Sequence, residues 1–186
     1  MKERLLLRAI LLALIAVLLG GCAGMEERAC DAHEQQTRGE KPVTTYRLVQ
    51  PKPGQPAARI LPAGSIAQVP TYTMSFRPGY TKPCTTLSLV KDVVIYRSND
   101  ADVALNEVRE FYAEDGTLIA TSTQDITAQV KTSGTYIATT PLPVPKSAPP
   151  GKYKIVSKLL FERQRERRPA AQIARAEGFF YIIPRR

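Results

Sequence analysis

The stretch Val108-Arg109-Glu110-Phe111-Tyr112-Ala113-Glu114-Asp115-Gly116-Thr117-Leu118-Ile119-Ala120 decides how this chain folds. Apolar or β-branched residues lie on both sides of Asp115-Gly116. Glycine supplies the positive φ that a tight hairpin turn requires, so the stretch predicts two antiparallel strands. A helix over 102–112 competes, because three apolar residues would share one of its faces. We favour the strand, since Asp115-Gly116 needs an antiparallel partner upstream.

Short β-rich runs bounded by proline and glycine lie on either side of this hairpin, and each has the length of a strand. They cover residues 43–49, 66–76, 86–96, 134–138 and 178–183. Pro149-Pro150-Gly151 leads into a further strand with one lysine face and one largely apolar face. The run 178–183 is apolar on both faces, which predicts that it is sandwiched or paired.

The order of these segments over Leu87–Ile183 resembles bacterial immunoglobulin-like and macroglobulin-like sandwich domains. Those domains share a strand, an Asp-Gly turn, a second strand, a Leu-Pro segment and a Pro-Gly-x-Tyr approach to a late strand. The resemblance implies an all-β fold, a single immunoglobulin-like antiparallel β-sandwich over 43–186, with Tyr153 near the tyrosine-corner position. The chain departs from antibody-type domains because it has no Trp for the core and no Cys pair to bridge the sheets.

A lipid-attachment signal precedes this domain. Lys2, Arg4 and Arg8 give a basic start, eleven apolar residues follow over 9–19, and Gly20-Gly21 then lead to Cys22. The apolar run is too short for a membrane-spanning helix, which needs roughly 20 residues. The segment resembles bacterial lipoprotein signal peptides, which implies a cleaved signal over 1–21 and diacylglyceryl and acyl groups on Cys22. An ordinary secretory signal that happens to contain a cysteine is the alternative.

The expected mature chain begins at Cys22 and carries a polar, flexible tether over 22–42. Cleavage removes three positive charges and one negative charge, so the net charge falls from +9 to +7 with the terminal amine counted as blocked. Ala23 follows the cysteine where an aspartate would mark inner-membrane retention. By resemblance, this predicts a periplasm-facing anchor in the outer membrane. A surface-exposed location stays open.

Cys30 and Cys84 remain after Cys22 is assigned to the lipid. In an oxidising compartment they predict one disulfide, which closes a loop of about 55 residues and stabilises the fold by at most roughly 4 kcal/mol. Two free thiols are the alternative, because spacing does not show that the side chains meet. Neither cysteine belongs to a CxxC pair, so a redox site is not predicted.

An arginine cluster lies between the last two predicted strands. Its members are Arg163, Arg165, Arg167 and Arg168. Guanidinium groups bind phosphate and carboxylate in a bidentate manner, so the cluster is a candidate site for an anion or an acidic partner. A solvated loop is the alternative. Nucleic acid is not predicted as a ligand, because the cluster has no interleaved aromatic residues.

Catalytic chemistry finds little support in the sequence. The one histidine, His33, lies in the predicted tether, where a nucleophile and base are poorly preorganised. Zinc ligands are lacking, and the acidic residues near Asn99 lack the spacing of a calcium loop. Glu107, Glu110 and Glu114 are expected to be solvated, since no Trp is present to stack a sugar. We therefore predict no cofactor and no metal.

These observations predict a lipid-anchored, non-catalytic protein of the cell envelope that binds or assembles with a partner protein through a sheet edge or its arginine-bearing end. An alternative function is binding or sensing of an anionic envelope ligand, lipopolysaccharide or acidic glycan, through the basic loop. The sequence leaves the identity of the partner open.

Overall fold

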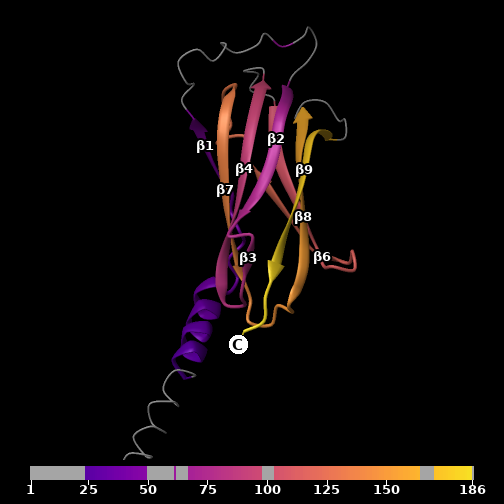
Figure 1. Cartoon of the computed structure of the whole chain (residues 1–186). Coiled ribbons are helices and arrows are strands. Elements are labelled where there is room, and N and C mark those ends of the chain that lie inside the picture. Colours follow the sequence, from indigo (N-terminus) through magenta and orange to yellow (C-terminus); the bar gives the residue numbers. More distant parts are fainter. Residues whose placement is uncertain (1–23, 50–60, 62–66, 98–102, 164–169, 186) are drawn as a thin grey trace, which may run out of the picture. The chain divides into compact units, whose positions relative to one another are not determined.

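The computed structural model describes residues 24–49, 61, 67–97, 103–163 and 170–185 (Figure 1). By its internal contacts the chain divides into two units, 1–39 and 40–186. The expected signal peptide and Cys22 lie outside the described residues.

The described part of the first unit is a helix over 24–37. The sequence predicted a tether with no sustained period, and the helix is a difference from that expectation. Its cause is local propensity, because Ala, Glu, Gln and Arg dominate this segment and all are good helix formers. No helix among the described residues is long and apolar enough to cross a membrane.

The second unit is a β-sandwich of two sheets that face one another (Figure 1). Its strands in the described residues are β1 (Thr45–Val49), β2 (Ala67–Arg77), β3 (Tyr80–Thr81), β4 (Thr85–Arg97), β5 (Val103–Tyr112), β6 (Leu118–Asp125), β7 (Gly134–Val144), β8 (Gly151–Arg163) and β9 (Ala171–Ile182). The first sheet has the order β1-β7-β4-β2 and the second β3-β9-β8-β5-β6. All neighbours are antiparallel except β3 and β9.

This strand order is immunoglobulin-like, as the sequence predicted. Immunoglobulin sandwiches carry strands A, B, E and D in one sheet and C, F and G in the other. Here β2-β4-β7-β1 matches A-B-E-D, and β5, β8 and β9 match C, F and G. The strand at the D place, β1, comes first in the chain and forms the sheet edge beside β7. The all-β sandwich is therefore confirmed, with an N-terminal strand where the usual topology has an internal one.

The hairpin that led the sequence analysis is confirmed. Strands β5 and β6 pair in antiparallel register, and Gly116 has φ +84 in the turn between them. The Ala113 N–H donates to the Thr117 carbonyl at 2.9 Å, and the Gly116 N–H donates to the Ala113 carbonyl at 3.0 Å. The competing helix over 102–112 is wrong, because alternate β5 residues are buried against the opposite sheet.

The start of β8 also matches its expectation. The hydroxyl of Tyr153 donates to the Pro149 carbonyl at 2.7 Å. A tyrosine near the start of strand F that bonds to the backbone a few residues upstream defines a tyrosine corner. The bond fixes the approach to the strand whose buried face carries Ile155, Ser157 and Leu159.

Candidate binding site

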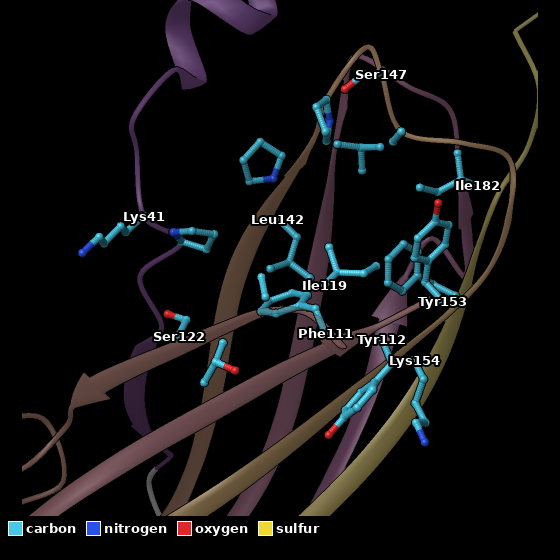
Figure 2. Close-up of a pocket in the computed structure, with 18 of the residues that line it drawn as sticks. Lys41, Phe111, Tyr112, Ile119, Ser122, Leu142, Ser147, Tyr153, Lys154 and Ile182 are labelled. Carbon is cyan, nitrogen blue, oxygen red and sulfur yellow. The ribbon is translucent and has the colours of Figure 1, made fainter. Parts of the chain in front are cut away.

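An apolar cavity of about 630 Å³ opens at one end of the sandwich, between the two sheets (Figure 2). Its lining includes Phe111 of β5, Leu142 and Val144 of β7, and Phe180 and Ile182 of β9. These side chains belong to one of the two buried apolar clusters of the domain. The cavity is thus a solvent-open extension of the core, and its volume is in the range of small-molecule and peptide side-chain pockets.

The cavity exists because β1 covers only part of β7. Their pairing runs from Val49 with Thr135 to Thr45 with Thr139, so the last five residues of β7 have no strand on this side in the described chain. Residues 40–42 pass the cavity instead, and the Pro42 carbonyl accepts a hydrogen bond from Arg109 Nη2 at 2.7 Å. Lys41 and Lys154 contribute to the lining, and their ammonium groups point away from the cavity (Figure 2).

Strand β6 borders this cavity and forms one edge of its sheet. The Ile126 N–H donates to the Leu105 carbonyl of β5 at 2.9 Å. Backbone direction alternates along a strand, so residues 120, 122 and 124 also face β5. The backbone groups of Thr121 and Thr123 consequently point away from the sheet, where a further strand would pair.

Proline or shortness limits strand addition at some of the other edges in the described residues. Pro141 and Pro143 lie on the uncovered part of β7. The Val144 carbonyl accepts from Cys84 N–H on the β4 side, so by alternation both proline nitrogens face outward. Strand β3 has only two residues, and β2 contains Pro70 at an irregularity in its register. Strand β1, the part of β9 beyond β3, and β6 contain neither proline nor lysine, the usual protective residues of an edge. Of these edges, β6 has eight residues and lines the apolar cavity over 119–123.

A buried polar layer divides the core into two apolar clusters. Lys91 of β4 forms an ion pair with Glu107 of β5, and both side chains are fully buried. Glu107 also accepts hydrogen bonds from Tyr46 Oη at 3.0 Å and Ser157 Oγ at 2.8 Å. Arg109, which is 1% exposed, donates from Nη1 to Thr44 Oγ1 at 2.6 Å. The layer joins the two sheets through charge instead of a disulfide.

Burial and pairing shift the pKa values in this layer. Burial lowers the pKa of Lys91 to about 8, although the Glu107 carboxylate opposes that change. Burial acts to raise the pKa of Glu107, but the Lys91 and Arg109 charges and the hydrogen bonds outweigh it and hold this pKa below its usual value. Burial, followed by the Glu107 charge, raises the pKa of Tyr46 well above its usual value. Because the layer is closed to solvent, we assign it a structural role in holding the two sheets together.

The expectation that Glu107 is solvated is wrong. It lies on the inner face of β5, and Lys91 of the opposite sheet compensates its charge. Glu110 is on the outer face and pairs with Lys158 at 2.5 Å, and Glu114 is close to the Lys152 N–H. A signal for the buried pair was present in the sequence. Lys91 interrupts the inner-face series Leu87, Leu89, Val93 and Ile95, and a lysine at such a position requires a buried anion.

The other predicted site residues divide into those the structure describes and those outside it. Cys30 and Cys84 are disulfide-bonded, which confirms the predicted bridge. Arg163 ends β8, while Arg165, Arg167 and Arg168 lie outside the described residues, so their role as a cluster stays a prediction. His33 lies in the helix. Within the described ranges, no three His, Cys, Asp or Glu side chains gather in a way that could hold a metal ion.

Comparison with known proteins gives no family for this chain. No protein-family model and no curated protein sequence matches it. Among solved structures, the ASH/PapD-like domain of human CEP192 is 9% identical, covers 72% of this chain and all of its own length, and has a TM-score of 0.37. A Bacteroides uniformis beta-glucuronidase 2 mutant is 21% identical over 62% of this chain, with a TM-score of 0.33. A family 123 glycoside hydrolase from Clostridium perfringens is 9% identical over 63% of this chain, with a TM-score of 0.35. This chain spans 12% of the glucuronidase and 27% of the hydrolase.

Proposed function

We propose that this protein is a lipid-anchored, non-catalytic binding protein of the cell envelope that captures an extended segment of a partner protein at β6. The lipid is attached at Cys22, and the anchor lies in the outer membrane and faces the periplasm. The observation that carries the proposal is the unprotected edge of β6 beside an apolar cavity. Edge pairing supplies main-chain hydrogen bonds, and adjoining pockets for side chains supply specificity.

The composition of β6 supports strand addition. Thr121 and Thr123 are β-branched and exposed, and their backbone groups face outward. Ile119 is 55% exposed at the mouth of the cavity, where an added strand would cover it. A long edge of this kind exposes a row of unpaired donors and acceptors, which is a liability unless a partner uses it. We infer that a partner does.

Photo-crosslinking in intact cells tests this function. A photoreactive residue in place of Thr121 is expected to form an adduct with a discrete partner protein, whereas the same residue in place of exposed Lys131 is expected to form none. Thr123→Pro removes one outward N–H without breaking a bond to β5, and should abolish the adduct. Thr123→Val keeps that N–H and should retain it. An adduct that survives Thr123→Pro, or that forms equally from position 131, contradicts edge binding.

Binding of lipopolysaccharide or an acidic glycan through the 163–168 loop is the second proposal. The net charge of +7 expected for the mature chain supports it, because clustered arginines attract polyanions. It predicts saturable binding that weakens with salt. Replacement of Arg163, Arg165, Arg167 and Arg168 by alanine should abolish that binding while leaving the β6 adduct intact. Binding that is unchanged in this variant eliminates the loop as the site.

A further inference from the structure

Exposed aromatic residues gather on the outer face of the second sheet. Tyr80 is 62% exposed, Tyr181 is 50% exposed and Phe179 is 47% exposed. Tyr80 pairs with Tyr181 across β3 and β9, so the two rings lie on neighbouring strands. The sequence predicted that 178–183 is sandwiched or paired, and in the structure the strand pairs with β8. The structure buries Phe180 and Ile182 and leaves Phe179 and Tyr181 exposed.

Lysines are interleaved with these rings. Lys152 pairs with Tyr181 and Lys154 pairs with Phe179 across β8 and β9. The Lys152 ammonium lies 4.3 Å from the centroid of the Phe179 ring, and the Lys154 ammonium lies 4.9 Å from that of Tyr112. We call Tyr80, Lys152, Lys154, Phe179 and Tyr181 the aromatic–lysine face. Amphipathic rings with adjacent cations are typical of residues at a membrane–water interface.

The connections at the same end of the sandwich are basic. They carry Lys82 before β4, Lys146 before β8 and Arg185 after β9, against Glu114 and Asp115 in the β5–β6 turn. A cationic residue near an anionic bilayer contributes about 1 kcal/mol of attraction. The end that bears the aromatic–lysine face therefore has the charge that an anionic lipid surface attracts.

Covalent connectivity limits how far the expected lipid can lie from this end. Cys84 immediately precedes β4, and its N–H donates to the carbonyl of Val144 at the end of β7. Cys22 lies eight residues before Cys30, which is bonded to Cys84, so even an extended chain between the first two cysteines spans at most about 29 Å. The thirteen residues of β8 span about 43 Å. The disulfide therefore keeps the lipid from reaching the opposite end of the sandwich.

We propose that the aromatic–lysine face docks on the surface of an anionic bilayer, with Tyr181 and Phe179 at the interface and Lys152 and Lys154 on lipid phosphates. The proposal rests on the lipid anchor of the proposed function and adds an orientation to it. The anchor retains the protein at the membrane, and the face fixes which side of the sandwich lies against it. Strand β6 is the edge strand of the same sheet, so docking of this face also fixes the distance between β6 and the bilayer.

Tryptophan fluorescence tests this docking, because the chain contains no Trp and an introduced one is a unique reporter. The lipidated full chain with Tyr181→Trp is reconstituted into vesicles of phosphatidylcholine and phosphatidylglycerol, with or without brominated phosphatidylcholine as quencher. Leu48→Trp is the matched control, because Leu48 is also 50% exposed but lies at the opposite end of the sandwich. Phe179→Trp is a second reporter if Tyr181→Trp does not fold.

The expected result is a loss of half or more of the Tyr181→Trp emission with brominated lipid and no loss for Leu48→Trp. High salt, or Lys152→Glu with Lys154→Glu, should reverse most of the quenching. Protein that floats with vesicles but whose reporter at 181 is not quenched overturns the docking and leaves the anchor intact. Protein that does not float overturns the anchor and the docking together. A crosslinker at position 181 that forms only protein adducts in cells assigns the face to a partner protein and also overturns the docking.

Discussion

Replacement of Lys91 by methionine should destabilise the domain severely, because it leaves a buried carboxylate without its cation. Lys91 and Glu107 are both fully buried, so water cannot replace the lost ammonium. Glu107 would keep the neutral donors Tyr46 Oη and Ser157 Oγ and the Arg109 charge, which is not hydrogen-bonded to it in the described contacts. Breaking a buried pair by removing one partner costs about 3–5 kcal/mol, which is a large share of the typical 5–15 kcal/mol of a domain.

A double-mutant cycle isolates the pair. Adding Glu107→Gln to Lys91→Met removes the unpaired carboxylate charge, while the amide oxygen still accepts from Tyr46 and Ser157. We therefore expect the double variant to be more stable than Lys91→Met alone by about 2 kcal/mol. Urea unfolding at pH 7, followed by circular dichroism with the disulfide intact, measures each free energy. A loss below about 1 kcal/mol for Lys91→Met, or additive effects in the double variant, would refute a charged buried pair.

Three further predictions concern the same domain. The pKa of Glu107 in the folded state lies below its ordinary value of 4.5, so the stability that this carboxylate contributes is complete above that pH and is lost as the pH falls. The free energy of unfolding of Glu107→Gln, measured by urea titration, should therefore decrease less steeply with falling pH. Gly116→Ala, at φ +84 in the β5–β6 turn, should cost about 1 kcal/mol in thermal unfolding, while an unchanged midpoint would mean that the turn relaxes. Tyr153→Phe should cost about 1 kcal/mol through loss of the bond to Pro149, and equal stability would show that the corner is maintained by packing alone.

The sequence predicted most of the strands because their signals are local. Asp115-Gly116 marks a turn at any position in a fold, and alternation in β8 requires only one buried face. The place of β1 was not predictable in the same way, since the sequence of a five-residue strand does not show which neighbour it pairs with. The helix over 24–37 was missed because it has no apolar stripe and is favoured by propensity alone.

The candidate site was predictable only in outline. A sheet edge was proposed from the fold class, but its location on β6 depends on which strand ends up without a neighbour. The cavity depends on the point at which β1 begins beside β7, which is a tertiary property. The Lys91–Glu107 pair joins strands from different sheets, so the partner of either residue could not be found from spacing along one strand.

In the lipid-anchored form proposed above, the disulfide between Cys30 and Cys84 would have a mechanical consequence. When a partner pulls on the sandwich, tension from Cys22 passes along the chain to Cys30 and then through the disulfide to the start of β4. Residues 31–83, including β1 and β2, are bypassed and carry none of that force. The force enters a strand that is hydrogen-bonded on both sides, by β2 and β7. Reduction would redirect it to β1, a five-residue edge strand that can be peeled from β7, and the envelope attachment would then yield at a lower force.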